Sequence, residues 1–111
     1  MELGIENRPQ AGWTIVEVSG ELDLHTSPRL RDHVMQLIDG GGRLVALDLT
    51  KVGFMDSSSL GVLITCLKRM REHEGRLVLI GVQSTPMKVL QLTGLDRVFE
   101  ILDSAAELDT H

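Results

Sequence analysis

The sequence predicts an α/β fold: one domain, residues 1–111, with a mixed, mostly parallel sheet of four to five strands and helices mainly on one face. Two nearly continuous apolar runs of strand length, Arg43–Leu49 (RLVALDL) and Arg76–Val82 (RLVLIGV), are typical of central parallel strands covered on both faces. Between them, Ser57 to about Glu74 carries apolar residues at helical spacing. Strand, helix and strand form a βαβ unit, which we expect to cross over right-handed.

Two strands and a helix are predicted before this unit. Leu3–Glu6 and Trp13–Ser19 flank Arg8–Gly12, whose proline and glycine suit a hairpin-like turn. The first helix is expected to begin at Thr26-Ser27-Pro28, where a capping hydroxyl precedes a proline at the first helical position. The glycines at 40–42 are expected to end it.

Three further elements are predicted after the βαβ unit. Thr85-Pro86 opens a third helix that runs to Gly94, and Arg97–Ile101 is a short strand. Ser104–Glu107 has the form of a capping box for a last helical turn or two. The predicted order is therefore β-β-α-β-α-β-α-β-α, without an internal repeat or linker.

Composition excludes several classes of function. At 111 residues and 42% apolar composition, the chain is long enough for one core and too short for two. A net charge of −5 with scattered basic residues argues against nucleic acid as a partner. One cysteine, no metal-ligand spacing and no Gly-rich phosphate loop predict that no cofactor is bound. No signal peptide or membrane-length apolar run is visible, so we expect a cytoplasmic protein without membrane attachment.

The stretch Phe54–Gly61 (FMDSSSLG) places three serines at the start of the long helix. Asp56 is the expected N-cap, with its carboxylate accepting from backbone N–H groups of the first turn. One hydroxyl would suffice for capping, so three call for another explanation. The positive end of the helix dipole stabilises an anion added to the first turn by roughly 0.3–1 kcal/mol. A phosphate there would add about −1.5 to −2 charges beside Asp56. The cluster therefore suggests a phosphorylation switch on an unchanged scaffold.

A simpler interpretation stays open at this point, because serines at a helix N-terminus are often only caps and solvated first-turn residues. On a helical wheel, Ser58 points most directly away from the apolar face, and Ser57 lies toward the flank. Gly61, one turn further along the outward side, would let a partner approach closely.

The segment FMDSSSLGVL after the strand LVALDLT, with GELDLHTSPRL upstream and KVLQLTGLDRVFEI downstream, resembles the STAS-domain family, specifically the bacterial anti-sigma factor antagonists (anti-anti-sigma factors). The resemblance covers nearly the whole chain and implies a STAS-like fold. It implies a partner-switching protein whose unphosphorylated form binds an anti-sigma factor serine kinase and so releases the sigma factor. It further implies that the kinase, using ATP and Mg²⁺, phosphorylates Ser57 and abolishes binding. Ser58 is a second candidate acceptor, and a PP2C-type phosphatase would reset the switch.

On this hypothesis we predict a partner-binding surface made of Asp23, Asp56, Ser58, Ser59 and Gly61. Asp23, in the segment GELD, matches a family position near the same end of the sheet. The family usually has glycine where this chain has Ser59, so the sequence departs from the family pattern at the site itself.

Two other functions are compatible with the residues. The first is a constitutive scaffold or adaptor of a larger signalling or transport assembly, never phosphorylated, an alternative that Ser59 keeps open. The second is a small hydrolase that uses Ser57, His25 and Asp23. A nucleophile elbow requires glycine two residues before and after the serine, and Met55 and Ser59 stand there instead. We therefore predict that the protein is not an enzyme.

Overall fold

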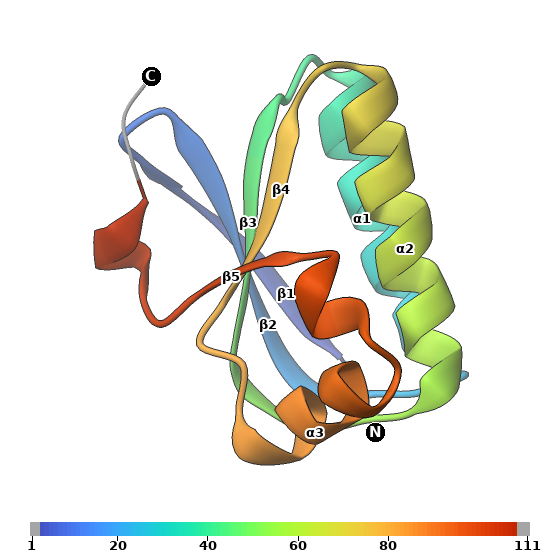
Figure 1. Ribbon diagram of the computed structural model, residues 1–111. Helices are drawn as coiled ribbons and strands as arrows, with labels where there is room; N and C mark the ends of the chain where they lie inside the picture. The colour runs from blue at the N-terminus through green and yellow to red at the C-terminus, as the bar shows by residue number, and fades with distance from the viewer. Residues whose placement is uncertain (1–2, 109–111) are drawn as a thin grey trace.

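The computed structural model describes residues 3–108 and contains a five-stranded sheet of order β1-β2-β3-β4-β5 (Figure 1). The strands are Gly4–Gln10 (β1), Trp13–Leu22 (β2), Leu44–Met55 (β3), Arg76–Ile80 (β4) and Glu100–Leu102 (β5). The pair β1 and β2 is antiparallel, and β2 through β5 are parallel. The predicted mixed, mostly parallel sheet is confirmed.

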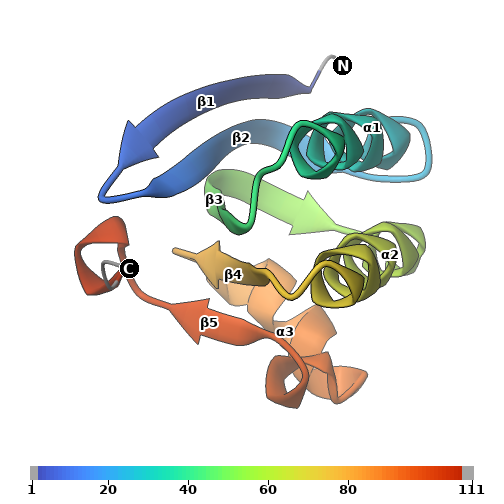
Figure 2. The same ribbon diagram turned by 90° about the horizontal axis from the view of Figure 1, so that it is seen from above.

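The helices are Ser27–Asp39 (α1), Ser57–Glu72 (α2) and Ser84–Leu92 (α3), with 3-10 turns at Leu95–Arg97 (η1) and Ala105–Glu107 (η2). Both long helices, α1 and α2, lie side by side on one face of the sheet, and α3 contacts β3 (Figure 2). This arrangement confirms helices mainly on one face. Within residues 3–108, no helix is long and apolar enough to cross a membrane.

The sheet is buried on both faces. The main core lies between the sheet and the two long helices and includes Val16 and Val18 of β2. A smaller core on the opposite face contains Trp13 and Ile15 of the same strand and is closed by Leu108. This alternation along β2 is the period of two expected of a strand that packs on both faces.

The hairpin between β1 and β2 is tighter than predicted. Both strands are longer, and the turn consists of Ala11 and Gly12 alone, with φ of +53° and +87°. Two-residue hairpins of this kind need positive φ at both positions. Pro9 lies within β1 rather than in the turn, which the edge position of that strand allows.

Strand β3 runs to Met55, well beyond the predicted end at Leu49. Its pairing with β2 shifts register twice, between Glu17 and Ser19 and between Gly20 and Glu21. Each shift adds one residue to β3, and an extra residue reverses the side-chain alternation. The prediction was wrong here because the bulged strand no longer follows a period of two.

The C-terminal part differs from the prediction in detail. Strand β4 ends at Ile80 rather than Val82, and the predicted strand start at Arg97 belongs to η1 instead. The capping box is confirmed, since the Glu107 carboxylate accepts from the Ser104 backbone N–H at 3.1 Å and the reciprocal bond is present.

Candidate functional site

Two neighbouring parallel strands end at the same edge of the sheet, and a helix follows each of them. Leu22, the last residue of β2, pairs with Met55, the last residue of β3. The Asp56 backbone N–H donates to the Leu22 carbonyl at 3.1 Å. Asp23 and Asp56 therefore follow adjacent strand ends, and this edge joins the β2–α1 loop to the first turn of α2. Loops at the carboxyl edge of parallel strands are where ligands and partners commonly bind in α/β folds.

Asp56 is the N-cap of α2, as predicted. Its backbone is extended (φ −96°, ψ 175°), and its carboxylate accepts from the Ser59 backbone N–H at 3.1 Å. The Ser58 hydroxyl donates to the same oxygen at 2.6 Å. These donors, the Ser58 hydroxyl above all and then the backbone N–H groups of Ser59, Leu24 and Ser58, hold the pKa of Asp56 below its usual value. The cap is therefore an anion at neutral pH.

Ser57, the first residue of α2, is exposed. Within residues 3–108 its hydroxyl makes no hydrogen bond to the protein. Ser58 is also exposed, but its hydroxyl is held by Asp56. Both predicted acceptors can thus be reached from solvent, and only Ser57 presents an uncommitted hydroxyl.

Ser59 differs from the two serines before it, because its side chain is only 1% exposed. Its hydroxyl lies 2.7 Å from the Asp56 carbonyl and 3.2 Å from the Leu22 carbonyl. The Ser59 side chain therefore links the end of β2 to the first turn of α2 by hydrogen bonding. We predicted Ser59 as part of the partner-binding surface, and this prediction needs correction because the hydroxyl is turned inward.

Asp23 lies at the predicted end of the sheet and organises the β2–α1 loop. Its carboxylate accepts from the backbone N–H groups of His25 and Thr26, each at 2.9 Å. The Thr26 N–H is the main reason that the pKa of Asp23 is lowered, with further contributions from the His25 N–H and the Thr26 hydroxyl. Asp23, like Asp56, is therefore negatively charged at this edge.

Thr26 occupies the N-cap position of α1, but its side chain makes no cap hydrogen bond. Its hydroxyl donates instead to the Glu21 carbonyl at 2.6 Å and closes the loop around Asp23. The prediction of a capping hydroxyl in Thr26-Ser27-Pro28 is therefore not met at the observed N-cap, because the Thr26 hydroxyl turns back toward the strand. Pro28 stands in the first turn, one residue after Ser27, which takes the first helical position predicted for the proline.

Gly61 is exposed on the outer side of α2, and apart from its chain neighbours and the adjacent backbone of α2, a Cβ built there would meet no atom within 4 Å. The surface is thus open at this point.

Ser57, His25 and Asp23 lie toward the same end of the sheet, but they are not hydrogen-bonded to one another as a catalytic triad. Within the described part of the chain, the His25 ring has no hydrogen bond to Ser57 or Asp23, and the hydrogen bond from His25 to Asp23 comes from its backbone N–H. A triad needs the base bonded to the nucleophile. No group of three metal-ligating side chains occurs within residues 3–108 either.

Two exposed apolar side chains at this edge were not predicted. Leu24, in the β2–α1 loop, is 66% exposed, and Phe54, near the end of β3, is 42% exposed. Phe54 was missed because the second register shift in β3 turns Met55 inward in its place. Leu24 could have been identified from the sequence, because it is an apolar residue between Asp23 and His25 that belongs to no periodic apolar run.

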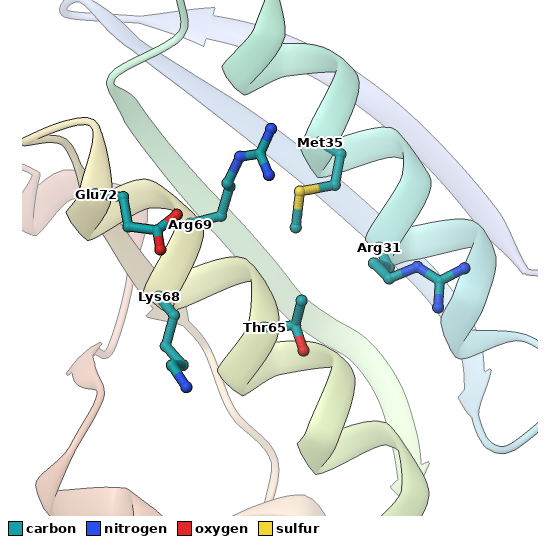
Figure 3. A pocket seen from close by; sticks show the side chains of 6 residues that line it. All are labelled: Arg31, Met35, Thr65, Lys68, Arg69 and Glu72. Atoms are coloured by element: carbon teal, nitrogen blue, oxygen red, sulfur yellow. The ribbon is translucent and has the colours of Figure 1, made fainter.

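A separate hollow of about 400 Å³ lies between α1 and α2 (Figure 3). Met35 and Arg69 extend into it from the facing helices. Two of its cations are already paired, Arg31 with Asp32 at 3.2 Å and Arg69 with Asp39 at 3.6 Å. None of the predicted site residues lines it.

Comparison with known proteins finds relatives over nearly the whole chain. The family model described as the STAS domain matches residues 4–108. The chain is 32% identical over 92 residues to the anti-sigma-B factor antagonist of Listeria monocytogenes, covering 83% of this chain and 81% of that protein.

Among solved structures, a Thermotoga maritima protein described as a candidate anti-sigma factor antagonist superposes with a TM-score of 0.87 at 27% identity, covering 93% of this chain and 89% of that one. The Bacillus cell fate determinant SpoIIAA in its phosphorylated form gives a TM-score of 0.71 at 23% identity, covering 95% and 94%. The latter likeness, at this identity, concerns the fold alone.

Proposed function

The chain belongs to the STAS-domain family, and from this premise we propose that it is a phosphoregulated anti-sigma factor antagonist. In its unphosphorylated form it binds an anti-sigma factor that is also a serine kinase, and the sigma factor is released. Phosphorylation of Ser57 abolishes this binding. The observation that carries the proposal is the uncommitted, exposed hydroxyl of Ser57 at a capped helix N-terminus.

The position of Ser57 suits a phosphate that changes the surface but not the fold. Its side chain makes no internal hydrogen bond within the described residues, so esterification breaks no contact. The positive end of the helix dipole favours an anion in the first turn. The added charge would stand beside the carboxylate of Asp56, so the surface at this edge would become strongly negative.

Ser58 is the less suitable acceptor. A phosphate on its oxygen would remove the hydrogen that it donates to Asp56 at 2.6 Å. It would also place a dianion directly against that carboxylate, whose cap on the Ser59 N–H would be strained by repulsion. We therefore assign Ser57 as the acceptor, keep Ser58 as the second candidate, and give its hydroxyl a role in partner contact.

In the transfer step, the Ser57 Oγ attacks the γ-phosphorus of Mg²⁺-ATP held by the kinase. The Oγ–P bond forms, the bond from the γ-phosphorus to the bridging oxygen breaks, ADP leaves, and the hydroxyl proton passes to a base of the kinase. A PP2C-type phosphatase would later hydrolyse the ester. Asp23, Asp56 and Gly61 belong to the surface that the kinase covers, whereas Ser59 supports that surface from below.

The test is phosphorylation of the purified chain by a purified anti-sigma factor kinase from the source genome with Mg²⁺-ATP. We expect one phosphate on Ser57, mapped by mass spectrometry, and its removal by a PP2C-type phosphatase. Ser57→Ala should abolish the modification, and Ser58→Ala should keep it. Absence of phosphate from both serines, together with an assembly that forms regardless of ATP, would instead support the constitutive scaffold.

A further inference from the structure

Large apolar side chains are exposed at four places among the described residues. These are Leu24 (66% exposed), Phe54 (42%), Leu92 (87%) and Val98 (43%). Single exposed apolar residues need no explanation. Leu24 and Phe54 differ from the other two because they belong to the two segments that lead to the serine cluster's end of the sheet, the β2–α1 loop and the end of β3.

The backbone fixes both residues in place. The Asp56 backbone N–H donates to the Leu22 carbonyl at 3.1 Å, and the Leu24 N–H is close enough to the Asp56 carboxylate to lower its pKa, so the loop lies against the start of α2. On the other side, Asp23 closes its turn through the N–H groups of His25 and Thr26. Phe54 is paired in the sheet with Glu21. The apolar side chains therefore project from ordered backbone, and little conformational entropy is lost when a partner covers them.

We propose that Leu24 and Phe54 are the apolar anchors by which the Ser57 kinase holds this chain. This inference rests on the proposed function. Phosphoryl transfer brings the γ-phosphate into contact with the Ser57 hydroxyl, so the kinase surface necessarily covers the neighbouring residues. A few side chains that become fully covered near the centre of an interface carry most of its binding energy, and we assign this role here to the exposed side chains of Leu24 and Phe54.

The charges at this edge define the chemistry of the partner surface. Asp23 and Asp56 are both carboxylates with lowered pKa, and Glu21 is exposed next to them. The matching surface is an apolar depression bordered by basic groups. A phosphate on Ser57 would keep the apolar contact but bring a dianion into it, which explains how one modification could release the whole contact.

The experiment compares Leu24→Ser and Phe54→Ser with Leu92→Ser and Val98→Ser, which remove apolar side chains of similar exposure elsewhere. Each variant is titrated calorimetrically with the anti-sigma factor kinase in the presence of Mg²⁺-ADP. We expect about tenfold or greater loss of affinity for each of the first two variants, and no change for the controls. The KM for phosphorylation of Ser57 should rise by a similar factor, with kcat retained.

Leu24→Ser carries the test if Phe54→Ser fails to fold, because Leu24 is two-thirds exposed and thermal unfolding of that variant should match the wild type. If the kinase binds the unmodified chain and a folded Leu24→Ser variant with equal affinity, the inference that Leu24 and Phe54 anchor the kinase is overturned. The proposed function would be unaffected by this result. A wild-type chain that does not bind the kinase would overturn both. A dimer that Leu24→Ser dissociates without change in kinase affinity would also overturn the inference and assign the surface to a second copy.

Discussion

The Ser58 hydroxyl donates a 2.6 Å hydrogen bond to the carboxylate of Asp56, the residue that caps the same helix. Charge-assisted hydrogen bonds to a carboxylate are short and comparatively strong. The bond makes neighbouring serines chemically unequal, since Ser57 stays uncommitted within residues 3–108. The roles of Ser57 in the switch, of Asp56 in the helix cap and of the buried Ser59 can therefore be measured with separate substitutions.

The first prediction concerns charge at Ser57. Ser57→Asp should leave thermal unfolding nearly unchanged, because the helix dipole favours an acid in the first turn while Asp56 opposes it. The same substitution should weaken kinase binding by about 30–150-fold, equivalent to about 2–3 kcal/mol. Calorimetric titration measures this effect. Ser57→Asn, of similar size and uncharged, is the control, and if it weakened binding as strongly, repulsion would not be the cause.

The second prediction concerns the cap. Asp56→Ala should lower the free energy of unfolding by about 1 kcal/mol, because the Ser59 N–H at the start of α2 loses its acceptor. Asp56→Asn keeps a side-chain oxygen for that N–H and should lose clearly less. Urea unfolding followed by the fluorescence of Trp13, the single tryptophan and a buried residue, measures the difference. Equal stability of the alanine variant and the wild type would contradict the capping role.

The third prediction is a pH dependence. The pKa values of Asp23 and Asp56 are lowered in the folded chain from 3.8, the value taken for the unfolded chain. The unfolded chain therefore binds protons first as the pH falls, so stability from these carboxylates is present above about pH 4 and decreases below it. Unfolding in urea across a pH series should show this decrease, and Asp56→Asn should remove part of it.

His33 provides an internal check on this pH series, because its effect falls in a different pH range. Burial lowers the pKa of its ring from 6.5. Because the pKa of His33 is lower in the folded chain, the unfolded chain binds this proton more readily. The free energy of unfolding should therefore decrease as the pH falls through about 6.5. His33→Gln should flatten the curve near that pH and leave the acid limb unchanged. A flat acid limb in the wild type would contradict the assigned carboxylate interactions.

The fourth prediction separates the buried serine from the exposed one. Ser59→Ala should destabilise the chain by roughly 1 kcal/mol, because the buried carbonyl of Leu22 and the half-buried carbonyl of Asp56 each lose a donor. Ser59→Gly should cost roughly another 1 kcal/mol through helix propensity. Ser58→Ala, at an exposed position, is the matched control and should have the smaller effect on urea unfolding. Equal loss for Ser58→Ala and Ser59→Ala would contradict the inward role of Ser59.

Much of the fold could be predicted because its signals are local or periodic. The helix α2 follows from apolar spacing, and β4 from a continuous apolar run between turns. The capping box at Ser104 was visible because both of its partners lie within four residues. The same holds for the cap at Asp56, whose acceptor and donors are neighbours in the sequence.

Elsewhere the prediction failed, because the deciding partner is distant along the chain. Ser59 is held by the carbonyl of Leu22, 37 residues earlier, and nothing near Ser59 in the sequence indicates that contact. The far half of β3 was missed because bulges against β2 break its alternation. Leu24 is an anchor candidate only because the fold brings its loop to Asp56, which again is a non-local relationship.

The last prediction concerns Cys66, the single cysteine, on the buried side of α2. Burial raises the pKa of its thiol to about 12, against a minor opposing effect of the Arg31 charge. Because the thiolate is the reactive form, a thiol reagent such as DTNB should react with the native chain only through unfolding. Labelling should be slow in buffer, immediate in denaturing urea, and faster in the destabilised Ser59→Gly variant than in the wild type. Rapid labelling of the native wild type, at a rate independent of stability, would show that the thiol is accessible and that the main core is less closed at α2 than described.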